Sequence, residues 1–396
     1  MVMRTGEALI VGAGNIGLGF LGEVMHEAGL VLTLADVNAE RVAALNREGA
    51  YPIELVSLEG IREQYIDGVK AISSLDEAAM IEATVKADVI TTAVGVDNLA
   101  KVAPTLAKGF VERLKRRPAD EVHLLVVACE NVGSNTQTLM DHILAALPDD
   151  EWRRRVEDKV SSPDCVVDRI VPNTKSGIDH PLAVTAEDYY QLAVDGPAIK
   201  HDIPYIPGME IVDNLEAKSL QKLFTLNGPH ADAGWLAYLK GYETIHEAMG
   251  DPNIRSLVRG HMDEVSIVIV GHNPSISVEQ QQAFADNTFR RFLNPYLKDE
   301  PSRVGRDPKR KLGARDRLLR PAILANDDGQ TTANINAAII GGFRFNNPAD
   351  PQAVAVHHEI DTAGLEAAVV AITGLQKTHP IVQHTVAGYQ LTELMV

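Results

Sequence analysis

The sequence predicts an α/β protein, with a doubly wound parallel sheet in the N-terminal part and a mainly α-helical C-terminal domain. Three observations support this fold class. Short apolar runs alternate with amphipathic segments in the first half, and helical periodicity dominates the second half. The chain of 396 residues is also long for a single hydrophobic core, which favours two domains.

The predicted strands are compact apolar runs, as expected for parallel strands that are buried on both faces. They cover residues 8–11, 30–35, 89–93 and 124–128, and further β-like runs follow at 166–171 and 181–194. Amphipathic segments at 17–28 and 39–47 predict helices between the first strands. This βαβ alternation indicates a parallel sheet covered by helices.

A stretch rich in proline and glycine, residues 196–208, predicts the boundary between the domains. A long helical pattern follows from about Met209, and strand-like runs become scarce after it. We therefore predict a first domain of residues 1–207 and a second, mainly helical domain of residues 208–396.

The composition, with 45% hydrophobic and 23% charged residues, is that of a folded globular protein. The formal net charge of −17 argues against nucleic acid or an anionic membrane as a partner. Apolar runs are too short for a signal peptide or a membrane-spanning helix, so we expect a cytoplasmic protein. Cys129 and Cys165 lie in apolar runs, which predicts reduced, structural cysteines.

A glycine-rich motif follows the first predicted strand and opens a predicted helix. The residues Gly12, Gly14, Asn15, Ile16 and Gly17 form the pattern G-x-G-x-x-G. The first glycine allows a tight turn, the second lets the backbone approach a pyrophosphate, and the third lets helix and strand pack closely. The motif predicts a Rossmann-type domain that binds a dinucleotide; a glycine turn without a ligand is the alternative.

The residue that ends the second strand predicts which dinucleotide binds. Asp36 falls 19 residues after Gly17, where a carboxylate accepts hydrogen bonds from the ribose hydroxyls and repels a 2′-phosphate. This position favours NAD, although Asp36 could instead cap the following helix. The fourth strand ends in small residues before Gly95, and Val94 is expected beside the nicotinamide half of the cofactor; plain packing is the alternative.

A Rossmann domain predicts a cofactor and leaves the reaction open. The sequence lacks the Cys, His and Glu spacing of zinc dehydrogenases, so no metal is expected. None of the nine tyrosines is followed four residues later by lysine, the pair used by short-chain dehydrogenases. A catalytic His/Asp pair stays open, because 13 histidines are present.

Three polar residues near the start of the second domain predict an active site. At about 100° per residue on a helix, Lys222, Asn227 and His230 fall near about 0°, 140° and 80°, so they could face one cleft unless Pro229 ends the helix. Apolar neighbours would lower the pKa of Lys222, as a general base needs. The alternative is a lysine that reaches solvent from a half-buried helix, with His230 as a hydrogen-bonded core residue.

Several blocks of the sequence resemble the polyol-specific long-chain dehydrogenases, and the resemblance covers nearly the whole chain. The blocks are residues 12–17, 35–38, 91–95, 128–131, 167–172, 206–210, 222–230, 294–299, 303–306 and 310–312. They are most similar to the family members that act on mannitol 1-phosphate. Two features depart from the family pattern: Leu18 stands where an arginine is common, and the pair Gly228-Pro229 is unusual.

The resemblance implies a metal-independent hydride transfer to NAD. The lysine matching Lys222 would be the general base, the asparagines matching Asn131 and Asn227 would hold the developing alkoxide or carbonyl oxygen, and the histidine matching His230 would orient the substrate hydroxyls. The implied reaction interconverts D-mannitol 1-phosphate and D-fructose 6-phosphate. The alternatives are an unphosphorylated polyol or hexuronate, as in mannitol 2-dehydrogenases and fructuronate or tagaturonate reductases, and an NAD-binding sensor without turnover.

A basic segment predicts where a substrate phosphate would bind. Residues 303–320 contain eight basic and two acidic residues, a local charge of +6 in a chain of −17. We predict that Arg306, Arg310 and Lys311 anchor the phosphate, because guanidinium groups bind phosphate in a bidentate manner. A solvated basic loop is the alternative. We expect a monomer or small homo-oligomer whose partner is a small sugar phosphate.

Overall fold

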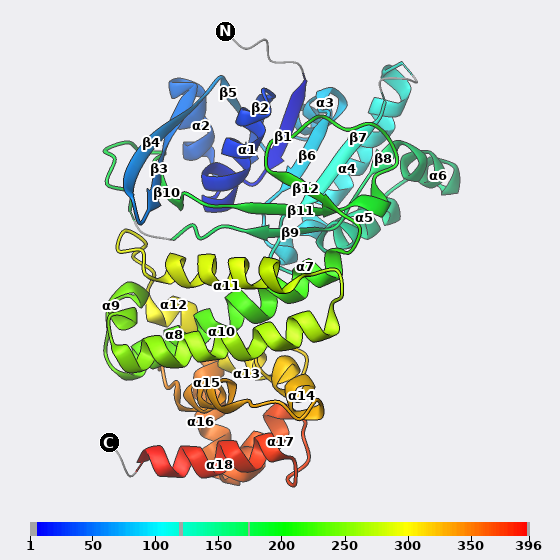
Figure 1. Ribbon diagram of the computed structural model, residues 1–396. Helices are drawn as coiled ribbons and strands as arrows, with labels where there is room; N and C mark the ends of the chain where they lie inside the picture. The colour runs from blue at the N-terminus through cyan, green and yellow to red at the C-terminus, as the bar shows by residue number, and fades with distance from the viewer. Residues whose placement is uncertain (1–5, 119–121, 173–174, 394–396) are drawn as a thin grey trace. The chain divides into compact units, whose positions relative to one another are not determined.

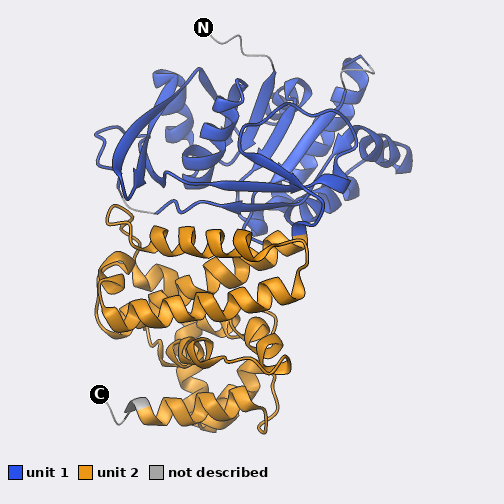
Figure 2. Cartoon of the chain, viewed as in Figure 1, with its two compact units in different colours: residues 1–215 blue, residues 216–396 orange. Residues whose placement is uncertain are grey.

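The computed structural model describes residues 6–118, 122–172 and 175–393 and divides into two compact units. Unit 1 comprises residues 1–215 and unit 2 residues 216–396 (Figure 2). In the described residues, no helix is both long and apolar enough to cross a membrane.

Unit 1 is built on a six-stranded sheet whose neighbouring strands are all parallel (Figure 1). Its strand order is β5-β2-β1-β6-β7-β8, the order of doubly wound dinucleotide-binding sheets. The strands are β1 (Glu7–Val11), β2 (Val31–Asp36), β5 (Val69–Ser73), β6 (Val89–Thr92), β7 (Leu124–Ala128) and β8 (Val160–Ser161). The four strands predicted first lie within one residue of these bounds, and the predicted fold class is confirmed.

Helices pack on this sheet and form two separate hydrophobic cores. One core contains Phe20 and Tyr51, and the other contains Phe110 and Leu139. The helical elements are η1 (Gly17–Leu21), α1 (Gly22–Glu27), α2 (Ala39–Glu48), α3 (Glu77–Lys86), α4 (Val96–Arg116), α5 (Asn135–Ala145) and α6 (Asp150–Lys159). The predicted helix at 17–28 therefore begins with a π-helical turn, η1.

Two three-stranded sheets complete unit 1. The first joins β3 (Ala50–Ser57), β4 (Gly60–Asp67) and β10 (Val184–Glu187); the second joins β9 (Cys165–Asp168), β11 (Gln191–Asp195) and β12 (Met209–Val212), with the short helix η2 (Gly196–Ala198) after β11. The helix expected from about Met209 is wrong, because this segment pairs in parallel with β11 and its backbone is hydrogen-bonded in a sheet. The first helix after it begins at Leu215.

Unit 2 is mainly helical, as predicted, and its secondary-structure elements in the described residues are all helices. Its elements are α7 (Leu215–Gln221), η3 (Lys222–Asn227), α8 (Gly228–Leu239), α9 (Ile245–Met249), α10 (Pro252–His272), α11 (Val278–Phe292), α12 (Pro301–Gly305), α13 (Pro308–Lys311), α14 (Leu319–Asp327), α15 (Ala333–Arg344), α16 (Pro351–Ala363), α17 (Leu365–Thr373) and α18 (Pro380–Glu393). Trp235 of α8 is fully buried at the centre, and its Nε1 donates to the Gly305 carbonyl at 2.8 Å. This bond attaches the basic segment to the core.

Candidate active site

The glycine loop after β1 has the geometry that a dinucleotide site requires. Gly12 has a φ of +102°, and a Cβ at this position would lie 2.5 Å from the Ala93 carbonyl oxygen. A Cβ on Gly17 would lie 1.9 Å from the Gly12 carbonyl oxygen, whereas a Cβ on Gly14 would meet nothing within 4 Å. Gly12 and Gly17 are thus required by the fold itself. The open space at Gly14 fits the approach of a pyrophosphate.

Asp36 holds the glycine loop in addition to facing the cavity beside it. Its Oδ2 accepts from the Ala13 backbone N–H at 2.8 Å and lies 3.3 Å from Nη1 of Arg41, and its Oδ1 accepts from the Asn38 N–H at 2.8 Å. The N-cap of α2 is Asn38, whose side chain accepts from the Arg41 N–H. Asp36 therefore does not cap the helix itself.

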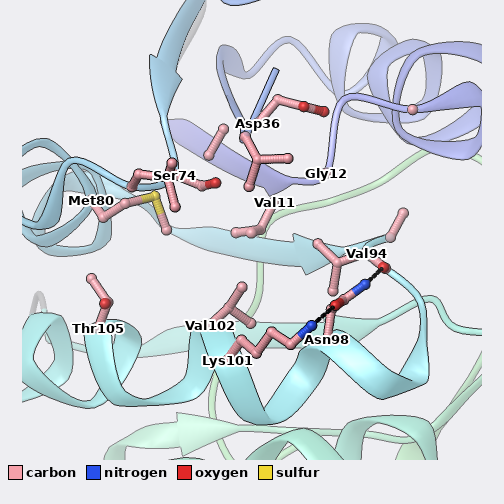
Figure 3. Close-up of a pocket in the computed structure, with 15 residues that line it drawn as sticks. Val11, Gly12, Asp36, Ser74, Met80, Val94, Asn98, Lys101, Val102 and Thr105 are labelled. Atoms are coloured by element: carbon pink, nitrogen blue, oxygen red, sulfur yellow. Dashed lines mark hydrogen bonds between the residues drawn. The ribbon is translucent and has the colours of Figure 1, made fainter. Parts of the chain in front are cut away.

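A cavity of about 340 Å³ opens beside the loop at the carboxyl ends of β1, β2 and β6 (Figure 3). Gly14 and Asp36 line it together with Val37, Leu75 and Lys101. The side chains of Val37 and Leu75 are large, apolar and highly exposed, at 67% and 77%. Exposed apolar side chains at the rim of such a cavity suit a flat ligand that covers them, such as an adenine ring.

The turn after β6 is fixed by a buried carboxylate from the turn after β7. Glu130 is 4% exposed and accepts from the Val94 N–H at 3.0 Å and from the Thr92 hydroxyl at 2.9 Å. Asn98 donates to the Val94 carbonyl at 2.8 Å (Figure 3). The adjacent residue, Asn131, is exposed. Glu130 therefore couples the positions of Val94 and Asn131, both predicted site residues.

The predicted catalytic residues of unit 2 lie on a π-helical turn that continues into α8. Lys222, Asn227 and His230 are the half-buried polar residues of this stretch, whereas Thr225 is fully buried. Hydrogen bonds between residues i and i+5 bring Lys222 and Asn227 closer to one side than the 140° of a regular α-helix. Pro229 does not end the helix, since it lies at the first turn of α8.

His230 lies beside an ionised carboxylate within unit 2. Its Nε2 is 3.1 Å from Oδ2 of Asp299, and its ring stacks on Phe292 with centroids 4.8 Å apart. Burial lowers the pKa of His230, and the charges of Arg303 and Lys311 lower it further against the opposing effect of Asp299. His230 is therefore neutral at neutral pH, and one of its ring nitrogens is available to a substrate hydroxyl.

Asp299 stays charged although it is 3% exposed. Burial raises its pKa, but the contacts with His230 and Arg303 outweigh this effect and hold the pKa below its ordinary value. Nε of Arg303 donates to Oδ1 at 2.7 Å. Arg303 thus supplies the positive charge, and His230 the second close polar contact.

Arg306 and Arg310, predicted to bind phosphate, are both exposed. The guanidinium group of Arg310 lies 3.3 Å from Oδ2 of Asp316 and 3.6 Å from Oδ2 of Asp307. Arg310 is therefore partly neutralised by acidic residues of its own segment.

Lys311, the third predicted phosphate ligand, is 5% exposed. Its Nζ donates to the Val304 carbonyl at 2.5 Å. Burial lowers the pKa of Lys311 to about 7, and the charges of Arg317 and Arg310 act in the same direction. At neutral pH its ammonium group is thus only partly protonated.

Comparison with known proteins assigns the family. The model of the mannitol dehydrogenase Rossmann domain matches residues 6–208, and that of the mannitol dehydrogenase C-terminal domain matches residues 214–388. The chain belongs to the mannitol dehydrogenase family. The polyol dehydrogenase resemblance of the sequence is therefore confirmed, and NAD as the cofactor agrees with the Rossmann domain of this family.

Two solved structures show the same fold as this mannitol dehydrogenase family member. Pseudomonas fluorescens mannitol 2-dehydrogenase, in a ternary complex with NAD and D-mannitol, has 18% sequence identity, covers 98% of this chain and 92% of its own, and has a TM-score of 0.74. A D-sorbitol dehydrogenase in substrate-free form has 15% identity, with 99% and 93% covered and a TM-score of 0.81.

The sequence alone did not single out Glu130, Asp299 or Arg303 in this family member. A signal for Glu130 exists, because an acidic residue two positions after an entirely apolar strand is expected to need a buried partner. Asp299 and Arg303 have the i,i+4 spacing of a helical ion pair, but nothing in that spacing points to His230. Within the described ranges, no group of three or more His, Cys, Asp or Glu side chains is placed to hold a metal ion.

Proposed function

We propose that this protein oxidises D-mannitol 1-phosphate to D-fructose 6-phosphate with NAD, and catalyses the reverse reaction. The observation that carries the proposal is the set of Lys222, Asn227 and His230 on one π-helical turn and the start of α8. His230 lies beside the buried Asp299, which pairs with the half-buried Arg303. A sensor that only binds NAD has no need of a base and oriented hydrogen-bonding side chains in this arrangement.

The side chains divide the chemistry between them. NAD, held by the glycine loop and Asp36 of unit 1, would supply the acceptor for the hydride of the carbinol carbon. Lys222 takes the proton of the substrate hydroxyl as the general base. Asn131 and Asn227 donate hydrogen bonds to the oxygen as its charge develops. His230, held by Asp299, orients the substrate hydroxyls.

The cofactor is held by unit 1 in this proposal. The backbone of Gly12, Gly14, Asn15 and Ile16 faces the pyrophosphate, and Gly17 permits the close packing behind it. Asp36 accepts from a ribose hydroxyl with the lone pairs that the protein leaves open, and Val94 packs beside the nicotinamide half.

The phosphate of the substrate is assigned to Arg306, Arg310 and Lys311. The charge of Lys311 acts on His230, and the charges of Arg310 and Arg306 act on Lys311. These charge effects support a positively charged region of unit 2 near His230. A substrate held by His230 at one end would meet positive charge at the other.

One observation favours the second candidate, an unphosphorylated polyol or hexuronate as the substrate. Arg310 is engaged by Asp307 and Asp316, and Lys311 by the Val304 carbonyl. Basic groups satisfied in this way need no phosphate. The mannitol 2-dehydrogenase and sorbitol dehydrogenase of the same fold are named for unphosphorylated polyols.

The deciding experiment is NAD reduction with mannitol 1-phosphate, run in parallel with mannitol, altronate and other polyols. We expect turnover with the phosphorylated substrate, and we expect Arg306→Ala combined with Arg310→Ala to raise its KM by about tenfold or more, because charge-assisted hydrogen bonds are lost. Arg315→Ala, an exposed arginine of the same segment, is the control. Turnover only with unphosphorylated substrates would select the second candidate, and NAD binding without any turnover would select the sensor.

A further inference from the structure

The π-helical turn that carries Lys222 has a buried polar side as well as an active one. Gln221, directly before Lys222, is 4% exposed, and Thr225, three residues after it, is 0% exposed. Lys222 and Asn227 are half-buried by contrast. The turn therefore buries the side chains of Gln221 and Thr225 in unit 2 and leaves those of Lys222 and Asn227 partly exposed.

Gln281 of α11 contacts both of these buried residues. Its Nε2 donates to the Thr225 hydroxyl and to the Ser266 hydroxyl, each at 2.9 Å, and its Oε1 accepts from Nε2 of Gln221 at 3.0 Å. Ser266 of α10 donates in turn to the Met262 carbonyl at 2.7 Å. Gln281 is itself 1% exposed. Both of its amide protons and its carbonyl oxygen are thus used within unit 2.

A closed network of this kind fixes one arrangement of the helices that share it. A buried amide that lost one partner would leave a polar group unsatisfied, which costs about 1–3 kcal/mol. A fully satisfied buried network therefore favours one register of the chain over its alternatives. The network contacts Gln221 before Lys222 and Thr225 after it. These contacts therefore constrain the rotation of the whole turn about its axis.

The register matters because a π-helical turn has a regular alternative. If the same residues formed α-helical hydrogen bonds instead, the turn would hold one residue fewer. The residues that follow the turn would then be rotated by about 100° around the helix axis. Asn227 would then turn away from the side of Lys222, whereas Thr225 would rotate less and would shift relative to Gln221 and Gln281. The hydrogen bonds of Gln281 at 2.9–3.0 Å are made with the turn in its π-helical register, the same register that brings Lys222 and Asn227 towards one side.

We propose that Gln281 is a positioning residue for catalysis, which holds the π-helical turn in the register that aligns Lys222 with Asn227. This inference rests on the proposed function, in which Lys222 is the general base. Gln281 acts through Thr225 and Gln221 and has no contact of its own with the reacting atoms in this proposal.

The test combines Gln281→Met with the isosteric substitution Thr225→Val. We expect each variant to lower kcat by about 10- to 100-fold, since small misplacements of reacting groups have effects of this size. The Kd of NAD should stay within about twofold, because the cofactor residues lie in unit 1. Thr225→Ser keeps the hydroxyl and should restore most of the activity.

The matched control is Thr373→Val on α17, which removes another buried hydroxyl from unit 2. Thr373 is 1% exposed and donates to the Val369 carbonyl at 2.6 Å. Its loss should lower the melting temperature and leave kcat at 25 °C unchanged. A folded Gln281→Met variant with unchanged kcat, or equal losses of kcat in Thr225→Val and Thr373→Val, would overturn the proposal.

Hydrogen exchange separates this proposal from the proposed function. In the protein without substrate, amides of residues 222–227 should exchange faster in Gln281→Met than in the wild type, while those of α17 stay unchanged. Faster exchange in Gln281→Met, together with no polyol turnover by the wild type, would contradict the proposed function but support the role of Gln281 in holding the turn. Unchanged exchange would contradict the positioning role even if Lys222 proves to be the base.

Discussion

In the described residues, each unit contains one π-helical turn beside its predicted site residues, and the two turns are held in different ways. In unit 1, the hydroxyl of the buried Tyr51 donates to the Leu18 carbonyl within η1 at 2.9 Å. In unit 2, Gln281 contacts the side chains of Gln221 and Thr225 around η3. One turn is held through its backbone and the other through its side chains.

The difference follows from what each turn presents to a ligand. The turn of unit 1 follows a glycine loop, where backbone N–H groups and the absence of side chains form the site. In the proposed function, the turn of unit 2 presents Lys222 and Asn227, whose side-chain directions would decide the chemistry. Leu18, which replaces the arginine common in the family, is 3% exposed in the core of unit 1, so this turn contributes no charge.

The largest expected effect separates two glycines of the loop. Gly17→Ala would place a Cβ 1.9 Å from the Gly12 carbonyl oxygen, so we expect the free energy of unfolding without NAD to fall by about 3 kcal/mol. Gly14→Ala meets only open space and should change this stability by less than about 0.5 kcal/mol. Urea unfolding of both variants measures the difference.

Gly14→Ala should nonetheless weaken NAD binding by about tenfold, or about 1.4 kcal/mol, because the Cβ occupies the space left for the pyrophosphate. A fluorescence titration with NAD gives this value. Unchanged affinity in Gly14→Ala would mean that the cofactor does not approach the loop here.

A smaller effect is expected for the hydrogen bond from Tyr51 that holds the π-helical turn of unit 1. Tyr51→Phe leaves the Leu18 carbonyl without this donor and should lower the free energy of unfolding by about 1–2 kcal/mol. Gly22→Ala would place a Cβ 1.9 Å from the Tyr51 hydroxyl oxygen but 3.2 Å from Cζ. We therefore expect Gly22→Ala to be less costly in the Tyr51→Phe background, with a coupling of about 0.5–3 kcal/mol.

The same double-mutant cycle sharpens the contrast between the turns. At saturating NAD, kcat of Tyr51→Phe should equal that of the wild type, whereas the variants around Gln281 lose kcat. Additive losses of stability in the cycle would show that the contact between Tyr51 and Gly22 is absent in solution.

The smallest expected effect concerns two histidines, one in each unit. Burial lowers the pKa of both His230 and His123, and the neighbouring His201, whose ring stacks on His123, lowers that of His123 further. The unfolded chain then binds more protons than the folded one below about pH 6.5, so stability is present above this pH and is lost as the pH falls. The loss is at most about 1 kcal/mol per histidine over one pH unit.

Urea unfolding between pH 7.5 and 5.5 checks this expectation. His230→Gln and His123→Gln should each reduce the loss of stability on acidification, and only His230→Gln should also raise the KM of the polyol. An increase of KM in His123→Gln would contradict the assignment of substrate contacts to His230.

The sequence predicted those parts of the molecule that depend on local pattern. The apolar runs of residues 8–11 and 124–128 became strands of the parallel sheet, and Gly14 and Asp36, both predicted to bind the cofactor, line one cavity of unit 1. Residues near Met209 were misread because four residues of a short strand resemble the start of a helix, and only pairing with β11 decides between them.

The candidate site of unit 2 could be predicted only in part from the sequence, since it depends on contacts between residues far apart in the chain. Lys222, Asn227 and His230 follow from their spacing and the family resemblance, but the π-helical register does not. Gln281 lies 56 residues from its partner Thr225, and Asp299 lies far from His230. No periodicity within one helix predicts such contacts between helices.

The most direct test of this account is the turnover of Lys222→Ala with NAD and mannitol 1-phosphate, measured beside its affinity for NAD. Lys377→Ala, an exposed lysine of the same unit, is the control. The account predicts a loss of about 10²- to 10⁴-fold in kcat at neutral pH, with the Kd of NAD unchanged and the control fully active. Wild-type turnover in Lys222→Ala would contradict the central claim that this lysine is the base.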